Sequence, residues 1–297
     1  MATKLEISQL DFDGIKDNLK TFLSQQDEFT DYDFEGSGMN VLLDVLAYNT
    51  HYLGYNANML ANEMYLDSAD QRSSVVSLAK QVGYTPKSAT SSTAKIDVVV
   101  NNAAGASLTM SRGTKFSTTV DGTNYSFVNN ADVSISPSDG VYKFSNLDIF
   151  EGTYLNFKYT ANTSDKDQRF IIPNDFVDTT TLTVKVQESS SDSTTNTYKL
   201  ASGVTGLDST SKVYFLQEVE NGRYEVYFGD GVIGQAIADG NIVILDYITC
   251  NLDEPNGATS FTLSGTVGGF ANVTITTLGN AANGSGPETI KSIKYNA

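Results

Sequence analysis

The sequence predicts an α+β protein, in which an N-terminal helical segment with one long helix is followed by antiparallel β-rich domains built as a sandwich or an open barrel. Apolar residues before Pro86 recur at the spacing of helices. Beyond Pro86 the pattern changes to short β-branched and aromatic runs between Gly, Asn, Asp and Ser clusters, as in antiparallel sheets. A hydrophobic content of 40% over 297 residues allows a sizeable core and excludes a chain that is disordered throughout.

The first helix is expected over residues 12–28, because Ile15, Leu19 and Phe22 fall on one face. Ser37 is the expected N-cap of the long helix that follows, since a serine side chain can accept a hydrogen bond from a free N–H group of the first turn.

The long helix is predicted over residues 39–66, where apolar residues recur at alternating steps of four and three. The first apolar stripe is Met39, Leu43, Leu46, Thr50, Leu53, Ala57, Leu60 and Met64. The second stripe, which runs beside it, is Leu42, Val45, Tyr52, Met59 and Leu66. A helix of this length measures roughly 42 Å, and a small domain rarely covers two such stripes. We therefore expect the first stripe to pack against other chains; an ordinary core helix of a helical subdomain is the alternative.

A third helix is expected after an N-cap at Ser68 or Asp70. Arg72 stands at its start, where a cation is unfavourably placed for the helix dipole. We expect Arg72 to have a specific partner, a carboxylate or helix-end carbonyls of this chain or another, because its planar fork suits bidentate contacts. It joins the candidate interface residues; a solvated surface arginine is the alternative.

The β-rich part is predicted to begin after a polar linker at residues 87–93. The expected strands cover residues 95–100, 114–120, 124–128, 155–160, 182–187, 212–219, 223–228, 242–249 and 273–277. The expected domains are a helical assembly domain at 1–86, a first β-rich part at 87–167, an inserted β subdomain at 168–210, a second β-rich part at 211–280 and the start of a C-terminal segment at 281–297.

A glycine-rich segment matches the dinucleotide-binding pattern G-x-G-x-x-G from Gly229 to Gly234. That pattern binds a pyrophosphate only where a helix N-terminus follows. Here a β-branched run follows instead, so we predict a strand-to-strand hairpin turn. Gly229, Asp230 and Gly231 are then structural residues that bind no cofactor.

No other motif indicates catalysis or metal binding. The acidic segment from Asp31 to Gly36 begins like a calcium loop, but the position of the bidentate glutamate is Leu42, so a helix-entry turn is the better interpretation. His51 is the only histidine, for which an interface or surface role is expected, and Cys250 is the only cysteine, expected to be a buried thiol. We predict that the protein is not an enzyme and has no catalytic residue, metal ligand or cofactor.

The charge balance limits the possible partners. A formal net charge of −16 and an isoelectric point of about 4.3 argue against nucleic acid and anionic membranes. No apolar run approaches the roughly 20 residues that span a bilayer. The N-terminal sequence lacks the basic and apolar blocks of a signal peptide, which favours a cytosol-like compartment.

Several motifs, ordered along the chain, resemble those of one family. They are DYDFEGS from Asp31, NVL from Asn40, LAYNT from Leu46, RSSV from Arg72, GYTP from Gly83, RGTKF from Arg112, FGDG from Phe228, NGA from Asn256 and GSGPE from Gly284. In these motifs the chain resembles the large baseplate wedge subunit of contractile-tailed, myovirus-type bacteriophages, of the baseplate J-like family. In that family a further helical region follows, whereas this sequence ends at Ala297, so we expect a chain that is short relative to the family pattern.

This resemblance implies a structural virion protein of the tail baseplate, made in the host cytoplasm. It implies that two copies pack with another wedge subunit through their N-terminal helices, and that other parts link wedges into a ring around the hub. The implied subunit interface is Met39, Leu43, Leu46, Leu53, Leu60, Met64 and Arg72. A β-rich receptor- or carbohydrate-binding module of a tail fibre or adhesin is the alternative, which the 16 tyrosines would allow although tryptophan is absent.

Overall fold

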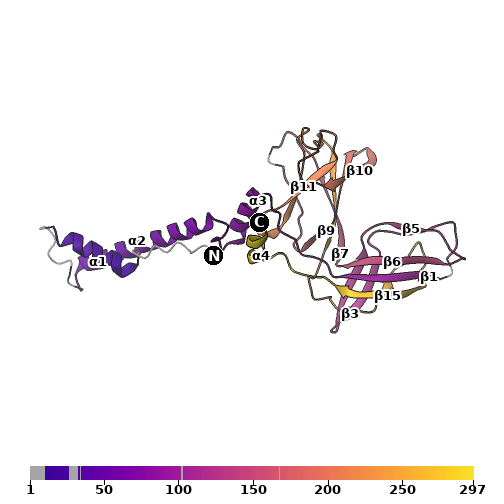
Figure 1. Ribbon diagram of the computed structural model, residues 1–297, viewed down its shortest axis with the longest axis horizontal. Coiled ribbons are helices and arrows are strands. Elements are labelled where there is room, and N and C mark those ends of the chain that lie inside the picture. The colour runs from indigo at the N-terminus through magenta and orange to yellow at the C-terminus, as the bar shows by residue number, and fades with distance from the viewer. Residues whose placement is uncertain (1–10, 27–32, 34, 102, 167) are drawn as a thin grey trace. The chain divides into compact units, whose positions relative to one another are not determined.

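The computed structural model describes residues 1–297 except 1–10, 27–32, 34, 102 and 167. Asp31, of the helix-entry turn, therefore lies outside the described residues. The chain divides into a helical unit, residues 1–84 with 290–297, and a β unit, residues 85–289. The α+β class is confirmed (Figure 1).

The helical unit begins with α1 (Phe12–Leu23) and α2 (Gly38–Glu63). Asp11 caps α1 by accepting a bond of 2.8 Å from the Gly14 N–H. Ser37 caps α2 by accepting one of 3.0 Å from the Asn40 N–H, as predicted. The long helix is confirmed as one continuous element of 26 residues, about 39 Å at the usual rise. The first helix is shorter than predicted, since Ser24 already stands at its C-cap.

Helices α3 (Arg72–Gln81) and α4 (Ile290–Asn296) form a second small core in this unit. Val75 and Ala79 of α3 pack with Ile293 of α4, and all three are fully buried. The predicted N-cap of α3 was wrong, because Gln71 occupies that position and its side chain caps nothing. The Glu63 carboxylate at the end of α2 accepts instead from the N–H groups of Asp70 and Gln71.

The β unit contains two sheets, and we call each sheet with its core a β body. The first β body has a six-stranded antiparallel sheet in the order β14-β3-β4-β6-β1-β15. Its strands are β1 (Thr93–Val100), β3 (Lys115–Val120), β4 (Thr123–Asn129), β6 (Tyr142–Glu151), β14 (Thr262–Ser264) and β15 (Val273–Ala282). A ribbon of β2 (Leu108–Met110) and β5 (Val133–Ile135) closes over the same apolar core, to which Phe116, Phe127 and Phe144 contribute.

The second β body has a seven-stranded sheet in the order β7-β13-β9-β10-β11-β12-β8, with one parallel pair, β10 and β11. The strands are β7 (Thr153–Thr160), β8 (Phe170–Ile171), β9 (Val177–Ser189), β10 (Asp192–Leu200), β11 (Val213–Glu218), β12 (Tyr224–Phe228) and β13 (Ile242–Thr249); a short helix, η1 (Glu220–Gly222), precedes β12. Its own core includes Val184, Leu245 and Tyr247.

The domain boundaries of the β unit differ from those expected. Residues 168–210 are no separate insertion, because β9 pairs with β10 on one side and with β13 on the other. In the sequence, the whole second β body, residues 153–249, is inserted between strands β6 and β14 of the first. The expected linker at 87–93 is packed as well, since Ser91 and Ser92 are buried.

Candidate assembly surface

One face of α2 is covered by α1 of the same chain. Asn40, Leu43 and Ala47 are the buried residues of α2, and Ile15 is the buried residue of α1. An ion pair of 2.5 Å between Lys16 and Asp44 joins the two helices beside this face. Leu43 is only 3% exposed, so it is a core position of the helical unit and not part of a free surface, contrary to the sequence-based expectation.

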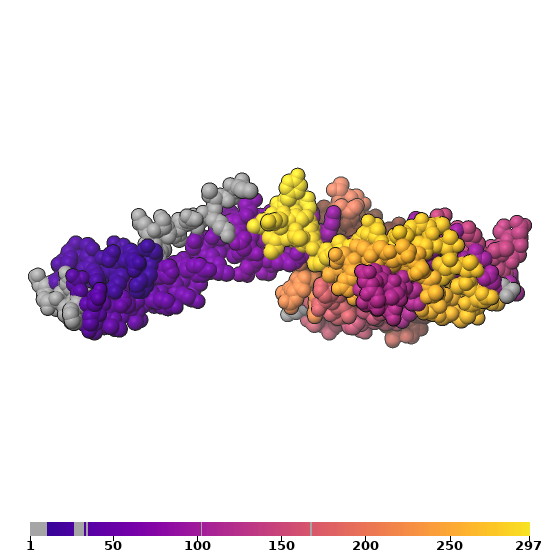
Figure 2. Space-filling model, turned by 90° about the horizontal axis from the view of Figure 1, so that it is seen from below, coloured from indigo at the N-terminus to yellow at the C-terminus, as the bar shows by residue number. Residues whose placement is uncertain are grey.

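Helix α1 covers only part of the length of α2. Helix α1 has 12 residues against the 26 of α2, so it can lie along only about half of the longer helix. Figure 2 shows α1 (indigo) at one end of α2 (purple), whose surface continues beyond it.

The rest of α2 exposes large apolar side chains in two parallel rows. The leucine row has steps of four and three and consists of Leu42, Leu46, Asn49, Leu53, Asn56 and Leu60. The tyrosine row has the same steps, one residue earlier, and consists of Val41, Val45, Tyr48, Tyr52, Tyr55 and Met59. The offset of one residue places the two rows about 100° apart around the helix.

The side chains of both rows stand open to solvent. Leu53 is 62% and Leu60 68% exposed, and every apolar member of either row exceeds 40%. Tyr48 and Tyr52 lie against each other, with ring centroids 6.1 Å apart. Helix α2 carries few charges: Asp44 is the single charged residue before Glu63. Asp44 forms an ion pair with Lys16 of α1. Monomers rarely expose apolar patches larger than a few hundred Å², so the two rows indicate a contact surface.

The structure places the predicted interface residues in three settings. Leu43 is buried, as described above, and the others are exposed or half-buried. Leu46, Leu53, Leu60 and Met64 are exposed on α2 or at its C-cap. Met39 is half-buried on α2, and Arg72 is half-buried at the first residue of α3, so these two are not part of the open rows. Three of the six members of the tyrosine row, Val41, Tyr48 and Tyr55, were not predicted. A four-three spacing that starts at Val41 contains all three.

The glycine-rich segment forms a tight turn. The Asp230 carboxylate accepts bonds of 2.9 Å from the N–H groups of Val232 and Ile233, and these bonds lower the pKa of Asp230. Gly231 has a φ of +86°, which favours glycine. No helix follows, but the predicted hairpin was wrong, because β12 and β13 are not neighbours in the sheet. The turn instead begins the connection from β12 to β13, which crosses β11, β10 and β9 of the same sheet.

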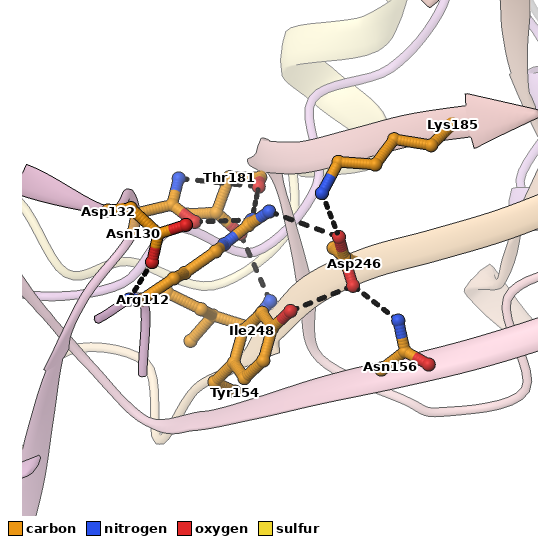
Figure 3. Close-up of polar contacts among 9 residues, drawn as sticks. All are labelled: Arg112, Asn130, Asp132, Tyr154, Asn156, Thr181, Lys185, Asp246 and Ile248. Carbon is orange, nitrogen blue, oxygen red and sulfur yellow. Dashed lines mark hydrogen bonds and ion pairs between the residues drawn. The ribbon is translucent and has the colours of Figure 1, made fainter. Parts of the chain in front are cut away.

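A buried polar cluster surrounds Asp246, a residue of β13 that is 1% exposed (Figure 3). Its carboxylate accepts from the Tyr154 hydroxyl at 2.8 Å and the Asn156 amide at 2.5 Å, and it pairs with Lys185 at 3.2 Å and Arg112 at 3.3 Å. Burial acts to raise the pKa of Asp246, but the bonds from Asn156, Tyr154 and Lys185 hold it below its ordinary value. Both carboxylate oxygens are thus engaged by donors, an arrangement that suits structure better than proton transfer.

The neighbouring Tyr154 is poorly suited to acid–base chemistry. Burial, together with the bond to Asp246, raises the pKa of Tyr154 to about 12, so the phenol stays protonated at neutral pH. Among the described residues, no group of three or more His, Cys, Asp or Glu is placed to hold a metal ion.

A shallow hollow on the first β body is relevant to the carbohydrate-binding alternative. It is lined by Ser117, Thr118, Thr119, Asn124, Ser260 and Thr262. The lining offers hydroxyl and amide groups but no aromatic ring on which a sugar could stack. None of the helices in the described ranges combines the length and apolar content needed to cross a membrane.

Comparisons with known proteins match the chain at the helical unit and at the second β body. Residues 11–84 match a family model described as the helical domain of gp6-like baseplate wedge proteins. Residues 156–252 match one described as the third domain of the bacteriophage baseplate wedge protein gp6. The baseplate wedge protein gp6 of Enterobacteria phage T4 is 30% identical over 95% of this chain. The chain spans about half, 46%, of the length of that relative.

Proposed function

Because the chain belongs to the gp6-like baseplate wedge proteins, we propose that it is a structural, non-enzymatic subunit of a contractile phage-tail baseplate, and that α2 is its assembly helix. The observation that supports this most is the pair of uncovered rows on α2. The same helix lies inside the segment that matches the wedge helical domain, residues 11–84.

Each row has the spacing of a helix–helix seam. Steps of four and three are those of the a and d positions of a heptad, which insert into holes of a facing helix. Two rows about 100° apart let α2 hold two helices at once. The proposed partners are a second copy of this chain and a helix of another wedge subunit.

The burial energies are of the size that such an assembly needs. Burying the exposed half of one leucine side chain contributes about 1 kcal/mol. The leucine row offers four such side chains, and the tyrosine row adds three tyrosines, two valines and a methionine. Burying both rows is therefore comparable to the cost of association, estimated at about 4–15 kcal/mol.

The asparagines in the leucine row favour one register of that seam over others. Asn49 and Asn56 stand seven residues apart at positions where the other members are leucines. An asparagine in a helix seam costs stability but favours the register and partner that satisfy its amide. The leucine row is therefore the selective seam, and the tyrosine row supplies contact area.

The wider role follows from wedge assembly. We expect wedges to form in the host cytoplasm, and other parts of the chain to link neighbouring wedges into a ring around the tail hub. Contacts between wedges would then hold the ring in one state and rearrange when the sheath contracts.

The test is co-expression with the other wedge subunits, with the mass of the complexes measured by sedimentation. Leu46→Asp and Leu53→Asp should leave the chain folded but free of partners, because each places a charge in the centre of a seam. Ser77→Asp, at an exposed position of α3, is the matched control. Wild-type complexes formed by both α2 variants would refute the assembly role of the leucine row.

A further inference from the structure

The two β bodies have separate apolar cores. The first core includes Ile96, Phe116 and Phe144, the second includes Val184 and Leu245, and the two sets of residues do not overlap. The chain leaves the first body between β6 and β7 and returns to it after β13. What holds the bodies together must therefore lie at this junction, in the crossings themselves or in contacts beside them.

The contacts beside the crossings are polar. Arg112 lies in the turn between β2 and β3 of the first body, and its guanidinium reaches Asp246 and the Thr181 carbonyl oxygen of the second, at 3.3 and 3.1 Å. It also lies over the Tyr154 ring, 4.9 Å from the centroid. Asn130 of the first body accepts from Arg112 at 2.6 Å and donates to the same Thr181 carbonyl oxygen at 3.3 Å.

Asp246 has two cationic partners, of which only one crosses the junction. Lys185 belongs to β9 and Asp246 to β13, so that ion pair lies wholly within the second body. Arg112 approaches from the first body, and Figure 3 shows both cations reaching the same carboxylate oxygen of Asp246. The two residues thus share one acceptor but differ in what they connect.

The rest of the junction is a buried polar layer. Glu151 is fully buried at the end of β6 and accepts two bonds from Asn251, one from its backbone N–H and one from its amide. Asp178 of β9 is 1% exposed and accepts from the Ser91 N–H at 2.8 Å. Buried polar contacts of this kind stabilise little against water but require one specific geometry.

The two chain crossings lie directly against each other. Gly152 has a φ of +128°, and a Cβ atom there would stand 2.1 Å from the Thr249 carbonyl oxygen. Only glycine fits this approach, so the outgoing and returning segments form one narrow connection. Two bodies joined through a narrow connection can turn about it once the contacts beside it are released.

We infer that Arg112 is a latch: it fixes the angle between the two β bodies, which otherwise hinge at residues 151–153 and 249–251. The latch is polar, so its release exposes no apolar core and leaves each body folded. It gives the chain one internal movement that is independent of the α2 assembly surface. The proposal does not depend on the function proposed above.

The latch can be tested on the full chain by single-molecule fluorescence energy transfer. Thr123→Cys in the first body and Ser191→Cys in the second provide exposed labelling positions, whereas the native Cys250 is buried. Arg112→Met removes the guanidinium that crosses the junction to Asp246 and the Thr181 carbonyl oxygen. Lys185→Met is the matched control, because it removes a cation from the same carboxylate without crossing. Hydrogen exchange of β1 and β13 reports whether each body stays folded.

We expect one narrow transfer distribution for the wild type and for Lys185→Met, and a broadened or second population for Arg112→Met with both strands still protected. An unchanged distribution for folded Arg112→Met overturns the proposal, as does equal broadening in Lys185→Met. If Arg112→Met loses protection in either strand, Asn130→Ala weakens the latch more mildly. Broadening in folded Asn130→Ala supports the latch, and an unchanged distribution or loss of protection contradicts it.

Discussion

Replacing Leu43 and Leu53 separately by alanine separates the core face of α2 from its open rows. The two substitutions remove the same atoms from the same helix, but Leu43 is 3% exposed and Leu53 is 62% exposed. Any difference between the variants therefore reports the environment of the side chain and not its chemistry.

The expected magnitudes follow from these exposures. Leu43→Ala should weaken the packing of α1 on α2 by about 2 kcal/mol, the low end for a buried leucine, because a two-helix contact beside solvent can partly collapse. Leu53→Ala should cost the isolated chain at most about 0.5 kcal/mol, since most of that side chain is already in water and alanine is a good helix former. For association with other wedge subunits we predict the opposite order, in which Leu53→Ala costs about 1–2 kcal/mol of binding and Leu43→Ala costs less.

Hydrogen exchange of the α1 amides measures the first effect, because their protection depends on docking to α2. Leu43→Ala should speed their exchange about 30-fold, and Leu53→Ala less than about threefold. Sedimentation with the partner subunits measures the second. Equal exchange in the two variants would show that Leu43 does not hold α1 against α2. Wild-type association of Leu53→Ala would show that the exposed row is not a seam.

Three further predictions concern single residues. The lowered pKa of Asp246 means that its contribution to stability is complete above a pH of about 4 and is lost as the pH falls through the folded value. Asp246→Asn should therefore lower the free energy of unfolding by about 3 kcal/mol at pH 7 and by less near pH 2. Urea unfolding at both values checks this, and an equal loss at both would contradict the assigned charge. Gly231→Val should lower stability by about 1–2 kcal/mol in thermal unfolding because its φ is +86°, and Gly231→Asn by less; equal midpoints would show that the turn tolerates any residue. Arg72→Lys keeps the charge but loses the planar fork, so it should weaken wedge assembly in sedimentation, and wild-type assembly of both Arg72→Lys and Arg72→Ala would make Arg72 an ordinary surface residue.

Local signals predicted part of this fold. The Ser37 cap of α2 and the core ranges of the nine expected strands follow from side chains and spacings within a few residues of the feature they specify. Strands β6 and β10, of 10 and 9 residues, were not predicted. The absence of a helix after the glycine-rich turn was also predictable, because the β-branched run that follows suits a strand.

Features set by distant residues could not be predicted in the same way. The start of α3 depends on Glu63, whose carboxylate replaces a local cap. The second β body depends on the pairing of β9 with β13, which no local pattern encodes. Arg112 lies 134 positions from Asp246, so neither residue indicates the other in the sequence. Leu43 was assigned to the subunit interface because a leucine in a core and a leucine in a seam look alike before α1 is placed.

The central claim, that the rows of α2 are covered by other chains in the baseplate, can be measured directly by photocrosslinking in assembled particles. A photoreactive amino acid at Leu53 or Leu60 would report which chain lies against the leucine row, with exposed Ser77 of α3 as the control position. We predict crosslinks from both row positions to a second copy of this chain or to another wedge subunit, and none of comparable yield from residue 77. Row positions that crosslink only within their own chain, or remain uncrosslinked in intact baseplates, would contradict the account.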